Sequence, residues 1–356
     1  MINNNSNKKY YTYGKYTLGG GNFIKKFTSK NSNPYSDKII SKFETMVWQD
    51  LCRISLQDKL SKLTVLNIGS GREALAFEKL GALDVYFVDK SKVNFNKIKF
   101  LQKINKTKVR SLNFDICSKI FSEQKLKFNL AYLNGVLHHT RDPQLALHNI
   151  KSKINIKQHG GIWLYLYQAG SVYNLIRFLQ NKIAKISKIN NQILYKAFKS
   201  KFNDRTTELN LDDVGCDYLN ILSSKTYKKI FERLNLKIVY SKDFYSKIKM
   251  SIRLNTKSCL VFIKVSNYKN KKIINYEKNE ILNFQNYEIE DQKIIKEFNR
   301  EYFNLINILN KKSKKSIINF IILLAKKKTK YDHLSSYEEK KKLLWQTIKE
   351  MKKFTL

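Results

Sequence analysis

Short apolar runs alternate with helical patterns through the first half of the chain. Five runs rich in apolar, β-branched and aromatic residues predict strands covered on both faces: Leu63–Ile68, Asp84–Val88, Val109–Phe114, Asn129–Leu133 and Gly161–Tyr167. Apolar residues at helical spacing predict helices around and between them, over Ser36–Leu60, Arg72–Leu80, Val93–Ile104 and Pro143–Ile154. Repeated strand–helix units predict an α/β fold with a parallel, doubly wound sheet and right-handed crossovers.

Two further strands are predicted over Leu236–Tyr240 and Cys259–Val265. A helix over Lys225–Leu234 precedes them, and Ser223 or Ser224 is a suitable N-cap for it. No helical pattern separates the two strands, so a parallel connection between them would lack its crossover helix. We therefore expect a seven-stranded sheet whose last strand is antiparallel, which differs from the six parallel strands of a dinucleotide-binding sheet.

Three segments lie outside this α/β pattern, which spans residues 36–266. Residues 1–35 are polar and aromatic and predict an N-terminal arm or cap. Residues 169–222 form an insertion after the fifth strand, and its first half has the apolar spacing of an amphipathic helix. Residues 267–356 are rich in lysine and predict a helical accessory region.

The most specific local signal is a glycine loop between the first strand and the first helix of the sheet. It reads Val65-Leu-Asn-Ile-Gly-Ser-Gly-Arg-Glu-Ala74, and Asp89 follows the next strand. Glycine lets the backbone turn sharply, and the helix start presents free N–H groups to a ligand. A carboxylate after the second strand can accept both hydroxyls of a ribose. The loop alone fits NAD as well as other adenosine cofactors.

The net charge of +39 has two explanations. One is a polyanionic partner, meaning nucleic acid or an anionic membrane surface. The other is a compositional bias, since only nine of the 68 basic residues are arginine and the chain has only two prolines. Arginine is the residue that binds phosphates bidentately. We therefore favour the bias, and nucleic acid stays a possible but less favoured partner.

The cysteines, histidines and apolar runs indicate which metal sites, compartment and membrane segments to expect. The four cysteines are far apart, so no metal-binding pair and no redox Cys-x-x-Cys occurs. His148, His159 and His333 are scattered, and no metal constellation is expected. This usage suits the reducing cytoplasm. The N-terminal residues lack the apolar stretch of a signal peptide. The apolar run Ile317–Ala325 is too short to span a bilayer, and we interpret it as a core helix rather than an interfacial one.

Three motifs in order give a resemblance to a known family. The glycine loop is followed by Gly135-Val-Leu-His-His139 after the fourth strand, and by His159-Gly-Gly161 at the entrance to the fifth. In these motifs the chain resembles the class I S-adenosyl-L-methionine-dependent methyltransferases. The resemblance covers residues 36–167 well and 223–265 in outline. It implies a Rossmann-like methyltransferase sheet, S-adenosyl-L-methionine as cofactor, and a methyl-transfer reaction.

The resemblance also implies roles for individual residues. Gly69 and Gly71 would face the carboxypropyl and ribose parts of the cofactor, and Asp89 would hold the ribose hydroxyls unless it only caps the next helix. The complete set of implied cofactor residues follows four strands: Asn67, Gly69, Ser70, Gly71, Asp89, Lys90, Asp115, Ile116, Asn134 and Gly135. His139 and Tyr167 are the candidate catalytic residues, with core packing as the alternative for each.

Two positions depart from the family pattern. Asn67 stands where the family usually has an acid, and Glu73 replaces the third glycine of the common loop. At the start of a helix a glutamate is favourable, and it could take over the charge pairing with the cofactor's ammonium. Alternatively, both changes weaken cofactor binding and the chain is a catalytically silent binding module.

The primary hypothesis is therefore a methyltransferase that acts on a small-molecule or carrier-linked acceptor, with residues 1–35 and 169–222 as a substrate lid. An RNA methyltransferase that uses the basic surface is the alternative. The sequence Asn134-Gly-Val-Leu137 lacks a Pro-Pro-Tyr-type signature, which argues against methylation of DNA-base amino groups. A dehydrogenase finds no support after residue 115. The acceptor and the oligomeric state are not indicated by any motif.

Overall fold

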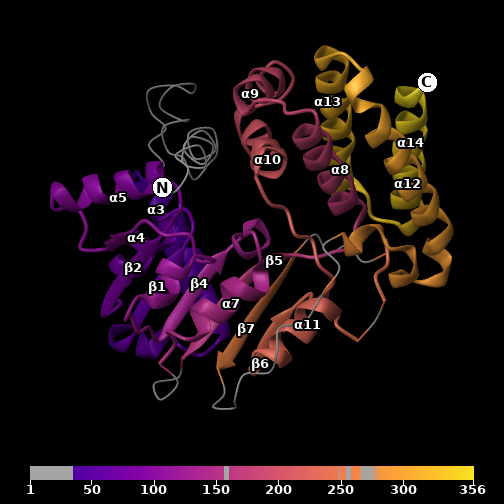
Figure 1. The fold of residues 1–356 in the computed structure, drawn as a ribbon. Coiled ribbons are helices and arrows are strands. Elements are labelled where there is room, and N and C mark those ends of the chain that lie inside the picture. The colour runs from indigo at the N-terminus through magenta and orange to yellow at the C-terminus, as the bar shows by residue number, and fades with distance from the viewer. Residues whose placement is uncertain (1–34, 156–159, 248, 254–257, 266–275, 277–278) are drawn as a thin grey trace. The chain divides into compact units, whose positions relative to one another are not determined.

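The computed structural model describes residues 35–155, 160–247, 249–253, 258–265, 276 and 279–356 (Figure 1). His159 and nearly all of the predicted N-terminal arm lie outside these residues. The chain forms two compact units, each described here by itself. The first takes the described residues within 1–166, 230–242 and 260–274, and the second takes those within 167–229, 243–259 and 275–356.

A seven-stranded sheet forms the centre of the first unit, in the order β3-β2-β1-β4-β5-β7-β6. Its strands are β1 Thr64–Ile68, β2 Asp84–Val88, β3 Arg110–Leu112, β4 Leu130–Asn134, β5 Gly161–Tyr167, β6 Leu236–Lys242 and β7 Ser258–Val265. The first five pair in parallel where their registers are defined, and β6 pairs antiparallel with β7. The predicted doubly wound sheet with an antiparallel last strand is confirmed.

Helix α3 Asp37–Arg53 precedes β1, and other helices lie between consecutive strands: α4 Arg72–Lys79, α5 Lys92–Lys103, α6 Lys119–Glu123, α7 Pro143–Lys151 and α11 Ser224–Arg233. The N-caps of α7 and α11 are residues that the sequence indicates as helix starts. The Asp142 carboxylate accepts bonds from the N–H groups of Gln144 and Leu145, and the Ser223 hydroxyl accepts one from the N–H of Thr226. The single helix predicted over Ser36–Leu60 is wrong at its end. It stops at Arg53, Ser55 adopts a left-handed backbone, and a 3₁₀ helix follows.

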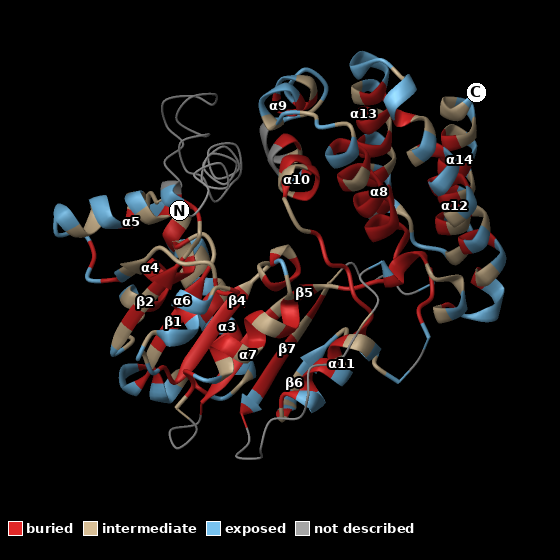
Figure 2. Ribbon diagram, viewed as in Figure 1, coloured by how far each residue is buried: buried red, intermediate tan, exposed pale blue. Residues whose placement is uncertain are grey.

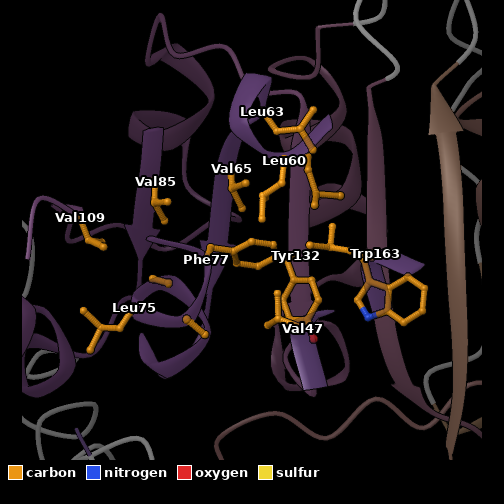
Figure 3. Packing of buried hydrophobic residues seen from close by; sticks show 14 of the residues in the cluster. Val47, Leu60, Leu63, Val65, Leu75, Phe77, Val85, Val109, Tyr132 and Trp163 are labelled. Carbon is orange, nitrogen blue, oxygen red and sulfur yellow. The ribbon is translucent and has the colours of Figure 1, made fainter. Parts of the chain in front are cut away.

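The core between the sheet and helices α3 and α4 is built from alternate strand residues (Figure 3). Val65 of β1 and Tyr132 of β4 lie in it, and the Tyr132 ring contacts the Phe77 ring edge-on at 5.2 Å. Alternate residues of a strand point to the same face. Asn67 and Asn134, each two residues further on, therefore share the face that α4 covers.

The second unit is a bundle of helices: α8 Val172–Ile186, α9 Asn191–Lys199, α10 Asp204–Gly215, α12 Ile289–Ile308, α13 Lys314–Lys330 and α14 Tyr337–Thr355. Helix α8 contacts α10, α12, α13 and α14, and twelve of its fifteen residues are buried (Figure 2). The insertion and the C-terminal region, predicted as separate parts, thus share one core. The run Ile317–Ala325 lies in α13 with most of its side chains buried, as expected for a core helix. Among the described residues, no helix is long and apolar enough to cross a membrane.

A buried cluster of charges lies inside this bundle. The Asp213 carboxylate contacts Arg177 Nε at 2.8 Å and Lys328 Nζ at 2.6 Å, and the three side chains are at most 7% exposed. Burial alone would raise the pKa of Asp213, but the charges of Arg177 and Lys328 outweigh it and lower this pKa. The Arg177 guanidinium also stacks on the ring of Tyr167 at 3.6 Å. One carboxylate therefore holds two buried cations.

Candidate cofactor site and active site

The glycine loop joins β1 to α4 through two residues that only glycine fits well. Gly69 has φ +133° and Gly71 has φ +82°, both in the left-handed range. A Cβ on Gly69 would lie 2.9 Å from Val136 Cγ2, and a Cβ on Gly71 would lie 3.1 Å from Ile98. The sharp turn expected from the sequence is present at this loop. The space around Gly69 and Gly71 is too small for a side chain at either position.

Comparing Gly71→Ala with Gly81→Ala separates two reasons why position 71 requires glycine: its positive φ angle and the lack of space for a Cβ. Gly81 also has positive φ, at +89°, but a Cβ there would meet nothing within 4 Å. We expect each variant to lose about 1–2 kcal/mol of unfolding free energy from the left-handed backbone, with an additional loss in Gly71→Ala from the tight contact. Only Gly71→Ala should weaken cofactor binding in calorimetry. Equal cofactor affinity in the two variants would contradict the role given to the loop.

Asp89 follows β2, and its carboxylate is held in place by two donors. The N–H of Ser91 donates to Oδ1 at 2.9 Å, and Asn94 Nδ2 donates to Oδ2. The Ser91 side chain makes no cap bond to α5, and the Ser91 N–H that Asp89 binds precedes the first residue of that helix. Burial raises the pKa of Asp89 to about 6, although the bonds from Asn94 and Ser91 oppose this shift. Each carboxylate oxygen can accept a further bond.

The residues after β3 form a turn that closes on itself. Asp115 Oδ1 accepts a bond from the N–H of Cys117 at 2.8 Å. Ile116 is buried, and its carbonyl accepts a bond from Asn149 of α7 at 2.9 Å. The Asp115 side chain thus has a local structural role, in addition to the adenine contact that the resemblance implies.

A carboxylate connects the residues that follow β1 and β4. Ser70 Oγ donates to Glu73 Oε2 at 2.9 Å, and Asn134 Nδ2 donates to Glu73 Oε1 at 3.1 Å. The Ser70 carbonyl accepts a bond from the Tyr35 hydroxyl at 2.9 Å. Two predicted cofactor residues from different strands are therefore joined through Glu73.

All ten predicted cofactor residues lie on the same side of the sheet, the edge formed by the carboxyl ends of its parallel strands. They lie at or just after the carboxyl ends of β1, β2, β3 and β4, which are parallel and therefore end at the same edge. The strand order reverses between β1 and β4, because β2 and β3 continue on one side and β5 on the other. Open α/β sheets bind ligands at this switch point, outside the carboxyl ends of the strands.

The two catalytic candidates belong to different compact units. His139 ends the 3₁₀ helix Leu137–His139 after β4, is half-buried, and packs against the fully buried His138 with ring centroids 4.4 Å apart. Tyr167 is the last residue of β5, but it groups with the second unit, where its ring contacts Arg177. Among the described residues, no cluster of histidine, cysteine and acidic side chains could hold a metal ion.

Sequence reasoning missed two residues that shape this site. Tyr35 lies in the segment predicted as an arm, and no local pattern indicates that its hydroxyl reaches Ser70. Asn94 lies in the first turn of α5, at a position where its amide can reach back to Asp89. An asparagine five residues after the acid is a weak signal that could have been noticed.

The fold and the arrangement of this edge define a class I methyltransferase. A family model described as "Methyltransferase domain" matches residues 47–241, which is more than half of the 356-residue chain. The chain belongs to this family of S-adenosyl-L-methionine-dependent enzymes. A comparison with curated protein sequences finds no match.

Several solved structures are similar at low identity. Magnesium protoporphyrin IX methyltransferase (ChlM) from Synechocystis PCC 6803, solved with S-adenosylhomocysteine, is 14% identical with a TM-score of 0.42, covering 72% of this chain and 99% of that one. The N-methyltransferase NodS from Bradyrhizobium japonicum WM9, also solved with S-adenosylhomocysteine, is 14% identical with a TM-score of 0.39, covering 73% and 100%. These similarities are too low to transfer a substrate or a residue role to this chain.

Proposed function

We propose that the protein transfers a methyl group from S-adenosyl-L-methionine to a small-molecule or carrier-linked acceptor. The observation that carries this proposal is the gathering of the glycine loop, Asp89 and Asn134 at the switch point of the sheet. S-adenosyl-L-methionine supplies a methyl group that its sulfonium has already activated. The protein then needs to hold and orient its ligands and to accept one proton.

The described residues fit this cofactor. Gly69 and Gly71 adopt the positive φ angles of a sharp turn at this edge, and a Cβ at either position would press against a neighbouring side chain of the protein. Asp89, with a pKa of about 6, is mostly ionised at pH 7.5 and can accept bonds from two ribose hydroxyls. The loop after β3 supplies Asp115 and Ile116 for the adenine.

For the proton we propose His139 as the acceptor, because it ends the short 3₁₀ helix Leu137–His139 that follows β4, Asn134 and Gly135 at this edge of the sheet. Tyr167, at the carboxyl end of β5, is proposed to contact the acceptor. The lid role of residues 169–222 stays a prediction, as does a location in the cytoplasm. The four free cysteines, three of them buried, suit a reducing compartment.

RNA is the second candidate for the acceptor, because of the net charge of +39. An RNA acceptor would show binding that weakens steeply as salt rises, as counterions are released from phosphates. A small-molecule acceptor would show methyl transfer that responds little to salt between about 50 and 200 mM. Transfer of labelled methyl groups to the RNA or the small-molecule fraction of a cell extract separates the two.

Calorimetric titration with three ligands tests the cofactor directly. We expect S-adenosyl-L-methionine and S-adenosylhomocysteine to bind and NAD to give no heat of binding. Binding of NAD alone would overturn the proposal. Binding of the two sulfur ligands without methyl transfer to any fraction would instead support a catalytically silent module.

A further inference from the structure

Glu73 is a buried carboxylate with no cationic partner among the described residues. It is 4% exposed, and its two oxygens accept bonds from the Ser70 hydroxyl and the Asn134 amide, both neutral groups. The neighbouring Arg72 is used elsewhere, since its Nε donates to Ser70 Oγ at 3.0 Å and its guanidinium lies over the Phe43 ring. A buried charge normally has a partner of opposite sign, because removing it from water is costly.

The place of Glu73 in the fold points to a ligand as that partner. Ser70 follows β1, Asn134 ends β4, and the strand order reverses between these two strands. Glu73 therefore lies where a class I methyltransferase holds its cofactor.

Asn67 provides an independent sign of a missing donor. It is fully buried on the face of the sheet that α4 covers, and its Oδ1 accepts no hydrogen bond from the described part of the chain. Within the described ranges its Nδ2 donates one bond, a long one of 3.5 Å to the carbonyl of Tyr132. A buried acceptor without a donor calls for an explanation, and at this position a donor group of the bound ligand supplies one.

We propose that Glu73 pairs with the ammonium group of S-adenosyl-L-methionine and replaces the acid that the family usually carries at the position of Asn67. An ammonium has three N–H donors, so it can serve the Glu73 carboxylate and further acceptors beside it. The inference rests on the proposed cofactor. It adds that the carboxylate that binds the cofactor's ammonium is at position 73, six residues after position 67, where the family usually has its acid.

The test compares two ligands and two variants of the full chain by calorimetry. S-adenosylhomocysteine carries the ammonium, whereas 5′-methylthioadenosine lacks the whole amino-acid part. Glu73→Gln should lower the affinity for S-adenosylhomocysteine about 10- to 100-fold, as expected for the loss of a charged hydrogen bond. It should change the affinity for methylthioadenosine less than about twofold, because that ligand has no group for Glu73.

Glu44→Gln is the matched control, since it removes one negative charge from the adjacent helix α3, where Glu44 pairs with Lys79. Its affinity for both ligands should equal that of the native protein. Glu73→Gln should also unfold at the same or a higher temperature than the native protein without ligand, because it removes an unpaired buried charge. Adding Asn67→Asp to Glu73→Gln should restore part of the lost affinity for S-adenosylhomocysteine.

Three results would overturn the inference. Equal losses for both ligands would show that Glu73 only shapes the loop. No loss for either would show that it is not at the ligand. S-adenosyl-L-methionine is titrated as a third ligand, and a loss for it but not for S-adenosylhomocysteine would place Glu73 at the sulfonium. If the native protein binds neither S-adenosylhomocysteine nor methylthioadenosine, the proposed cofactor fails instead, independently of Glu73.

Discussion

Replacing Asp89 with alanine is expected to weaken S-adenosylhomocysteine binding by about a hundredfold or more. Two charge-assisted bonds to the ribose would be lost, each worth about 1.5–3 kcal/mol, and about 1.4 kcal/mol corresponds to a factor of ten. Calorimetric titration at pH 7.5 measures the change. Asp84→Ala is the matched control, because Asp84 begins the same strand at the opposite edge of the sheet. Similar affinities in the two variants would remove Asp89 from the site.

The pKa of Asp89 adds a second readout to this prediction. Because this pKa is raised to about 6, the carboxylate becomes protonated as the pH falls through 6. S-adenosylhomocysteine affinity should be constant above about pH 7 and should fall towards pH 5, by up to about tenfold per pH unit. The folded-state pKa lies above the ordinary value of 3.8. The contribution of this group to the stability of the ligand-free protein is therefore full below pH 3.8 and is lost as the pH rises through 6. Asp89→Asn should abolish both dependences.

Asp213→Ala is expected to cost about 3–5 kcal/mol of unfolding free energy, because it leaves Arg177 and Lys328 buried without an anion. Denaturant unfolding followed by circular dichroism measures the loss in the helices of the second unit. Asp212→Ala removes the same charge from the neighbouring, half-buried position of α10 and should cost far less. Lys328→Met should also cost less than Asp213→Ala, since it leaves Arg177 and Asp213 as a balanced pair. A loss below about 1 kcal/mol in Asp213→Ala would mean that water reaches the cluster.

Local patterns predicted much of the sheet. The bounds of β2 and β5 agree with prediction, because their apolar runs end at clear polar or glycine residues. The break after Arg53 could not be predicted, since Ile54-Ser55-Leu56 contains neither proline nor glycine. The expected amphipathic helix at Val172 forms as α8, but it is buried on nearly all sides, including Asn174 and Arg177. Apolar residues at helical spacing indicate one buried face of a helix. They cannot reveal that the polar residues on its other face are also buried.

The parts of the site that depend on contacts between distant residues were beyond sequence reasoning. The glycine loop and the acid after β2 are adjacent motifs with known spacing, and they were identified. The bond between Asn134 and Glu73 spans 61 residues, and that between Lys328 and Asp213 spans 115. The loop pattern singles out Glu73 because it replaces a glycine and could pair with the cofactor's ammonium. Only packing shows that it is buried and that no cation among the described residues pairs with it.

The discontinuous second unit has a consequence for how the protein is made. Helix α8 leaves the ribosome long before α12, α13 and α14, which begin at Ile289, Lys314 and Tyr337 and complete its surroundings. During synthesis its apolar residues have to stay in solution, or be held by a chaperone, until α14 has emerged. A stop codon just before α14 would therefore expose a helix that ends about 150 residues earlier in the chain, at Ile186. Degradation signals in such products would arise from the middle of the polypeptide, not from its end.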